Sequence, residues 1–150
     1  MTPKEFEKHL ARCKMQISRM MRSDGLPYMV GSRLVDMMKA NFQTQSFFGR
    51  KWKDVKRRTH PTKWQLRHAD SQRLILTGRT GNLGRSIQFK PTNGEVTIFS
   101  DVVYSAVHNW GGRAGRGGRT VIPQRQFIGK HPRVDKEVMR IINNAIKKIL

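Results

Sequence analysis

The segment LTGRTGNLGRSI, residues 76–87, carries glycines of the kind that can turn backbone N–H groups toward a phosphate. Three glycines, three residues apart, precede Arg85 and Ser86. The phosphate loop of nucleotide hydrolases needs Gly-x-x-x-x-Gly-Lys-Ser/Thr between a strand and a helix. Here Arg79 stands where the first glycine is needed, an arginine replaces the lysine, and the residues that follow read as a strand. The dinucleotide pattern Gly-x-Gly-x-x-Gly also has a different spacing, so we expect no nucleotide site.

Residues that could perform catalysis or hold a metal do not gather in the sequence. The histidines are His9, His60, His68, His108 and His131, and none stands close to a second histidine, a cysteine or a carboxylate at ligand spacing. The pair His108-Asn109 is a weak match to a His-Asn-His nuclease, and a histidine satisfied by the backbone is the better interpretation. Acids are scattered, and no serine or cysteine has a placed base. We expect no enzyme, no metal and no cofactor.

The charge balance is strongly basic. The 150 residues hold 30 Lys+Arg against 10 Asp+Glu, a net charge of +20. Such a balance favours a polyanionic partner, with nucleic acid as the default and an acidic protein as the alternative. Two segments concentrate the charge, residues 50–67 and the low-complexity stretch GGRAGRGGR at 111–119. The candidate contacts to DNA or a partner are Lys56, Arg57, Arg58, Arg113, Arg116 and Arg119, although both segments could also be solvated loops.

The single cysteine, Cys13, excludes a disulfide within the chain. Its spacing places it on an apolar helical stripe, so we expect a small core residue. The first residues lack the apolar core of a signal peptide, and no apolar run reaches the length of a membrane-spanning helix. We therefore expect a soluble protein made in a cytoplasm, without a membrane partner.

Helices are predicted at both ends of the chain. Thr2-Pro3-Lys4-Glu5 reads as a capping box with proline in the first turn. The apolar residues of the helix that follows are Phe6, Leu10, Cys13, Ile17 and Met20. A second helix is expected near 27–42, and the two helices either form a hairpin or belong to neighbouring subunits. A C-terminal amphipathic helix is expected over 132–150, starting at Pro132.

The middle of the chain reads as small β-structure with long basic loops. Residues 44–75 have no clean period, and we expect an extended, partly mobile basic loop. Strands are predicted at 86–90 and 95–100 around Asn93-Gly94, a strong hairpin signal. One or two helical turns are expected within 102–112 and a further strand at 120–123, cut by proline.

These elements predict a single α+β domain over residues 1–150. Its parts are a helical part at 1–43, the basic loop at 44–75, a β-rich part at 76–130 that contains the arginine-glycine loop 111–119, and the closing helix.

Three motifs stand in a fixed order in the second half of the chain. They are ILTG with TGNLGRSI at 75–87, VYSAVHNWGG at 103–112 and IPQRQFIG at 122–129. Together they resemble the phage Mu-type virion morphogenesis family, the tail-completion proteins of tailed phages and prophages. The family pattern runs Thr-Gly-x-Leu-x-x-Ser-Ile, a tyrosine-alanine-histidine segment ending in glycine, then Ile-Pro-x-Arg-x-Phe-Ile/Leu-Gly. The resemblance covers residues 48–150, and Ser105 departs from it because the family usually has alanine after the tyrosine.

The resemblance implies a structural virion protein. Such proteins are similar to neck subunits that form a ring, expected to be a hexamer, which terminates the tail and joins it to the head around the DNA channel. Implied partners are the chain itself, tail tube or tail terminator proteins, head connector or adaptor proteins, and genomic DNA by non-specific contact. The virion is the implied location, after assembly in the host cytoplasm. The alternative, from charge, is a free-standing nucleic-acid-binding protein. The residues that carry the resemblance are Trp52, Gly81, Leu83, Ser86, Ile87, Tyr104, His108, Gly111, Pro123, Arg125, Phe127 and Gly129.

Some of these residues allow local expectations. Leu83 and Ile87 should anchor the chain to the core. Tyr104, Val107 and Trp110 should pack one face of a short helix and leave His108 near a subunit contact. Arg125 offers bidentate pairing with a carboxylate, either across subunits or buried within one chain.

Overall fold

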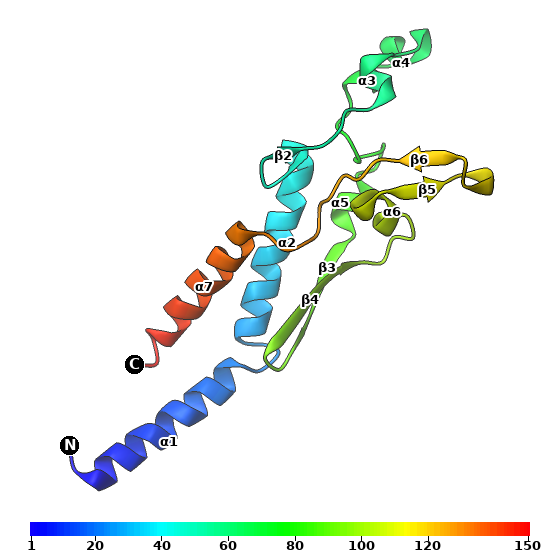
Figure 1. Cartoon of the computed structure of the whole chain (residues 1–150). Helices are drawn as coiled ribbons and strands as arrows, with labels where there is room; N and C mark the ends of the chain where they lie inside the picture. The colour runs from blue at the N-terminus through cyan, green and yellow to red at the C-terminus, as the bar shows by residue number, and fades with distance from the viewer. The chain divides into compact units, whose positions relative to one another are not determined.

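The computed structural model describes residues 1–150 and has an α+β fold, as the sequence predicts (Figure 1). The chain divides into two compact units. The terminal unit holds residues 1–34, 89–98 and 130–150, and the motif unit holds residues 35–88 and 99–129. Helix α2 and the β3–β4 hairpin contribute residues to both units. The single-domain organisation stays a prediction.

Helix α1, Pro3–Met20, begins with the capping box that the sequence predicts. The Glu5 N–H donates to Thr2 Oγ1 at 3.3 Å, and the Thr2 N–H donates to the Glu5 carboxylate at 2.6 Å. The helix has no buried residue, and Phe6 and Leu10 are about half exposed. The prediction that Cys13 is a core residue is therefore wrong, because Cys13 is only half-buried and the stripe residues on either side of it are about half exposed. The Cys13 Sγ lies 3.6 Å from His9 Nε2.

Helices α2, Leu26–Thr44, and α7, Pro132–Ile146, supply most of the terminal unit's core. Its buried apolar residues are Leu26, Val30 and Leu34 from α2 and Val134 and Ile141 from α7. At the surface, Arg33 Nε and the Glu137 carboxylate form an ion pair at 2.8 Å. Helix α7 confirms the predicted closing helix. No helix in the chain is both long enough and apolar enough to cross a bilayer.

Strands β3, Ile87–Thr92, and β4, Glu95–Ser100, pair around Asn93-Gly94 as predicted. In the terminal unit the turn is fixed by the end of α1. The Gly94 N–H donates to the Met21 carbonyl at 2.9 Å, and Asn93 Oδ1 accepts from the Ser23 N–H at 3.1 Å. The Asn-Gly turn therefore does more than reverse the chain, since it also holds the segment after α1.

The segment 44–75 is not the extended loop that we expected. It contains β1 (Ser46–Phe47) paired antiparallel with β2 (Arg50–Lys51), the short helices α3 (Lys56–Thr59) and α4 (Lys63–Arg67), and a 3₁₀ turn, η1 (Asp70–Gln72). The missed signal for α4 was a second capping box, because Thr62 Oγ1 accepts from the Gln65 N–H at 3.3 Å. Elements this short leave no apolar period for a sequence pattern to detect.

The arginine-glycine stretch forms the tip of a β-hairpin (Figure 1). Strand β5, Gly112–Ala114, pairs antiparallel with β6, Thr120–Ile122, and the 3₁₀ turn η2, Arg116–Gly118, joins them. Glycines at 115, 117 and 118 all have positive φ, which explains why this tip needs glycine. The strand predicted at 120–123 is confirmed, and the predicted helical turns are α6, Ser105–Trp110.

Candidate functional site

Half of the motif residues are buried in the motif unit: Trp52, Leu83, Ser86, Ile87, Arg125 and Phe127. Leu83, Ile87 and Phe127 have 3%, 2% and 0% of their surface exposed. The Phe127 ring lies 5.1 Å from that of Phe42, and the Trp52 ring meets the same phenylalanine edge-on at 5.4 Å. The expectation that residues 83 and 87 anchor the chain is confirmed by their burial. Phe42 joins Trp52 to Phe127, which lies much later in the sequence, in one aromatic cluster.

The arm of residues 123–129 has no regular structure, so other groups must satisfy its backbone. Asn109 makes three of the bonds to this backbone. Its Oδ1 accepts from the N–H groups of Phe127 and Ile128, both at 2.9 Å, and its Nδ2 donates to the Ile128 carbonyl at 3.1 Å. Asn41 Nδ2 donates to the Phe127 carbonyl at 3.2 Å, and Trp52 Nε1 donates to the Gln126 carbonyl at 2.7 Å.

Neither asparagine was recognised from the sequence. Asn109 is 5% exposed and Asn41 3% exposed. A polar residue inside a predicted apolar helical segment was the available signal, because burying an amide requires that it be fully hydrogen-bonded.

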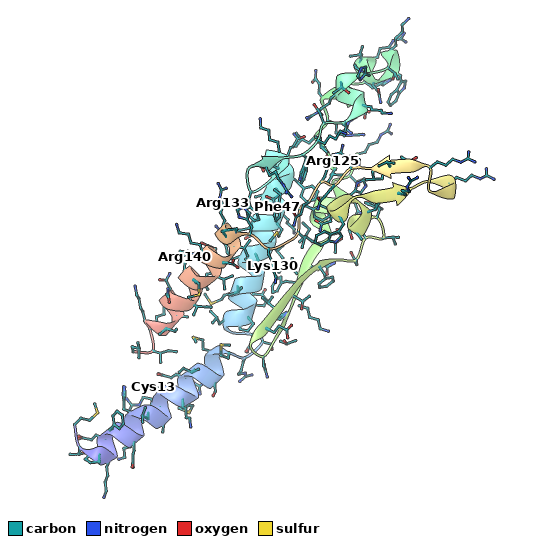
Figure 2. The ribbon with its side chains drawn as sticks, in the orientation of Figure 1. Cys13, Phe47, Arg125, Lys130, Arg133 and Arg140 are labelled. Carbon is teal, nitrogen blue, oxygen red and sulfur yellow. The ribbon has the colours of Figure 1, made fainter.

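Arg125 lies on the arm (Figure 2). Its side chain is buried. Its Nε donates to the Lys53 carbonyl at 2.8 Å and its Nη2 to the Asp54 carbonyl at 3.1 Å. The expected bidentate partner was a carboxylate; the actual partners are two successive backbone carbonyls. The fork geometry that suits a carboxylate also spans neighbouring carbonyls, so Arg125 joins the arm to the segment after β2.

The stretch 76–87 enters β3 through one helical turn, α5, Asn82–Arg85. We had expected a strand directly after the glycines. Gly81 adopts φ +66° before α5, and a Cβ on Gly84 would lie 3.4 Å from the Phe42 ring. Ser86 Oγ donates to the Leu83 carbonyl at 2.7 Å. The glycines thus serve backbone conformation and close packing.

The face of α6 differs from the expectation. Tyr104 and Trp110 are 44% and 65% exposed, and only Val107 is half-buried. The buried residue of the helix is instead Asn109. His108 is half-buried, and its ring lies 6.0 Å from that of Tyr104. Its pKa is lowered, mainly by burial and to a smaller extent by the positive charge of Arg125. Its expected place at a subunit contact stays a prediction.

The remaining motif glycines relieve close contacts. Gly111 has φ +77°, and a Cβ there would lie 3.0 Å from the Gln124 nitrogen. A Cβ on Gly129 would overlap the Gln126 side chain. Pro123 is half-buried at the start of the arm.

The candidate contact residues divide into two groups. Arg113, Arg116 and Arg119 are exposed on the β5–β6 hairpin and form no ion pair. In α3, Lys56 is exposed, whereas Arg58 lies 3.7 Å from the Asp54 carboxylate. Arg57 differs from all of these, because its Nη2 donates to the carbonyls of residues 73 and 74 at 2.8 Å. Arg57 is therefore part of the structure of the motif unit.

Metal-ligating side chains do not gather: no group of three His, Cys, Asp or Glu residues could hold a metal ion.

Comparison with known proteins gives a consistent match. The model of the phage virion morphogenesis family matches residues 4–147. A Mu-like prophage protein of Haemophilus influenzae, FluMu G protein 2, is 31% identical over 71 residues. That alignment covers 47% of this chain and 51% of the relative, so the chain matches about half the length of that protein. No solved structure matches.

Proposed function

This chain belongs to the phage virion morphogenesis family, and we propose that within virion morphogenesis it acts as a tail-completion, or neck, subunit. In this role copies of the chain form a ring that terminates the tail and joins it to the head around the DNA channel. The ring presents ordered surfaces to a tail protein on one side and a head connector protein on the other. The role is one of assembly, with no chemical turnover.

The observation that carries this proposal is the β5–β6 hairpin. Arg113, Arg116 and Arg119 are exposed and form no ion pair. Arg113 lies on strand β5, and Arg116 and Arg119 lie at the tip, where Gly115, Gly117 and Gly118 have positive φ. Unpaired arginines attract phosphate through charge without reading sequence. A channel that passes a whole genome meets every base sequence, so contact that does not read sequence suits it.

The terminal unit supports contact between copies. The α1 stripe leaves Phe6, Leu10 and Ile17 about half exposed. Apolar residues aligned on one helix face in this way mark a surface for association. A ring uses heterologous contacts, in which the surface of one copy meets a different surface of the next.

Deleting the gene from its phage or prophage tests the role. Electron microscopy of induced lysates should show DNA-filled heads and separate tails, and the wild-type gene supplied in trans should restore joined particles. Normal joined virions from the deletion strain would exclude the proposal.

Complementation with variants then tests the hairpin. Replacing Arg113, Arg116 and Arg119 with glutamine should reduce infectious particles. The matched control replaces three exposed lysines of the terminal unit, Lys130, Lys136 and Lys147, and removes the same charge. Equal yields from the two triple variants would show that the hairpin has no special part.

The same arginines favour the second candidate, a free-standing nucleic-acid binder. An electrophoretic shift assay with long duplex and single strands, at low and moderate salt, separates the two. Tight binding by the monomer favours the second candidate. Weak binding, with ring formation seen by analytical ultracentrifugation, favours the neck subunit.

A further inference from the structure

The motif unit contains a cavity of about 360 Å³ that the proposed function does not use. Five separate parts of the motif unit line it: α3, the segment after η1, the start of α5, helix α6 and the arm. The basic side chains at its wall are Arg57, Arg73, Arg125 and His108, and no carboxylate lines it. Apolar walls come from residues such as Ile75 and Leu83.

Several nitrogens of this wall are buried without a hydrogen-bond partner in the chain. They are Arg57 Nε, Arg73 Nε and His108 Nδ1. Two of them are guanidinium N–H groups, which can only donate, and the imidazole nitrogen donates in one tautomer. A buried donor without an acceptor destabilises the fold. Three such nitrogens at one cavity therefore indicate that an acceptor from outside the chain binds there.

The positive charge of the wall is only partly balanced. Asp70 forms an ion pair with Arg73 Nη1 at 2.8 Å and Asp54 forms one with Arg58, and neither acid lines the cavity. Burial and the Arg73 charge lower the pKa of Arg57, and burial and the Arg57 charge lower that of Arg125. These arginines therefore repel one another, and an anion between them would relieve that repulsion.

We propose that the cavity binds a carboxylate from an acidic side chain of a partner protein. Guanidinium donors match the two oxygens of a carboxylate, and the apolar walls suit the methylene stem of a glutamate. A duplex backbone fits less well, because its phosphates belong to a continuous chain, whereas these nitrogens have almost no surface exposed. That the partner is a neck, head or tail subunit rests on the proposed function; the anion site itself does not.

Titration of the ¹⁵N-labelled full chain with acetate, glutarate and inorganic phosphate, at constant ionic strength, tests the site. The arginine Nε–H signals of Arg57 and Arg73 report binding directly. Acetate and glutarate should shift these signals, and Arg73→Gln should weaken binding about tenfold or more, as expected for a lost charged hydrogen bond. His108→Gln provides a second variant that leaves the Arg73–Asp70 pair intact.

The matched control is Arg113→Gln, which removes one positive charge outside the cavity and should change the affinity by less than about twofold, as expected for a screened, distant charge. Shifts with phosphate but not with acetate would overturn the carboxylate partner and indicate a nucleic-acid contact. No shift, or equal affinity in both cavity variants and the wild type, would overturn the site. Normal virions from the gene deletion would exclude the proposed neck function but would not affect the evidence for the anion site.

Discussion

Asn109 Oδ1 accepts a hydrogen bond from the Phe127 N–H at 2.9 Å, which joins helix α6 to the arm that carries the most buried aromatic ring of the chain. Because the same oxygen also accepts from the next N–H, one amide satisfies two backbone donors of a segment without regular structure. The arm has no strand partner, and it is held by side chains together with one backbone bond, from the Arg125 N–H to the His108 carbonyl at 2.8 Å. Asn109 therefore holds the arm together with the motif residues Trp52 and Arg125, which also bond to it or from it.

Replacing Asn109 with leucine, which keeps the size and removes the amide, should destabilise the chain strongly. The N–H groups of residues 127 and 128 would be left buried and unpaired, at roughly 1–3 kcal/mol each. Urea unfolding followed by tryptophan fluorescence measures the loss. The control is Asn143→Ala at an exposed position of α7, where a change within about 0.5 kcal/mol is expected. A similar loss in both variants would contradict the assigned role of Asn109.

Gly81 allows backbone strain to be tested separately from packing. Its φ is +66°, and an added Cβ would meet nothing closer than the Thr77 carbonyl oxygen at 4.0 Å. Gly81→Val should therefore cost at least about 1–2 kcal/mol from the left-handed conformation. Gly81→Asn should cost less, because asparagine tolerates this region. Equal unfolding free energies for the valine and asparagine variants would mean that the conformation is not the cause.

The sequence predicts the long elements because their signals are local. The capping box at Thr2 and the apolar period of residues 134–149 identify helices α1 and α7, and Asn93-Gly94 identifies the hairpin. Leu83 and Ile87 are also predicted as core residues, since apolar residues four apart indicate a buried face. The spacing of the glycines is visible in the sequence, and it is enough to exclude a nucleotide-binding loop.

What the sequence does not predict depends on contacts between distant segments. The partners of Arg125 are backbone carbonyls 71 and 72 residues away. Because every residue has a backbone carbonyl, the sequence does not indicate which ones accept a hydrogen bond. Cys13 was assigned to a core because periodicity shows which residues share a face, without showing whether anything covers that face. The cavity wall of Arg57, Arg73 and His108 is equally invisible, since its members lie on separate elements.

Gly31 weakens the sequence prediction of α2, and the structure gives the reason for a glycine there. A Cβ at this position would overlap the Phe89 ring and lie 2.7 Å from Val96. Gly31→Ala should gain about 1 kcal/mol of helix propensity but lose about 1–3 kcal/mol to overpacking, so a net loss is expected.

Thermal and urea unfolding of four chains test this account: wild type, Gly31→Ala, Phe89→Ala and the double variant. The alanine at position 31 should destabilise the wild-type background more than the Phe89→Ala background, where the ring is absent and only Val96 lies too close. Ser32→Ala, on the exposed side of the same helix, controls for propensity. The same effect of Gly31→Ala in both backgrounds would contradict the overlap.

Glu137 should make the terminal unit sensitive to acid. Its carboxylate accepts from Arg140 at 2.8 and 3.0 Å and from Arg33 on α2 at 2.8 Å, and these bonds lower its pKa from 4.5 to about 2. Between pH 4.5 and 2 the unfolded chain binds the Glu137 proton more readily than the folded chain does. The stability that the charged Glu137 contributes is therefore fully present above pH 4.5 and is lost as the pH drops from 4.5 toward 2. Glu137→Gln should therefore melt at a lower temperature than the wild type at neutral pH, with a difference that shrinks as the pH falls from 4.5 toward 2.

The control is Glu95→Gln, at an exposed acid without an ion pair, whose melting temperature should differ little from that of the wild type at every pH. A pH-independent difference for the Glu137 variant would show that the two arginines do not stabilise its charged form.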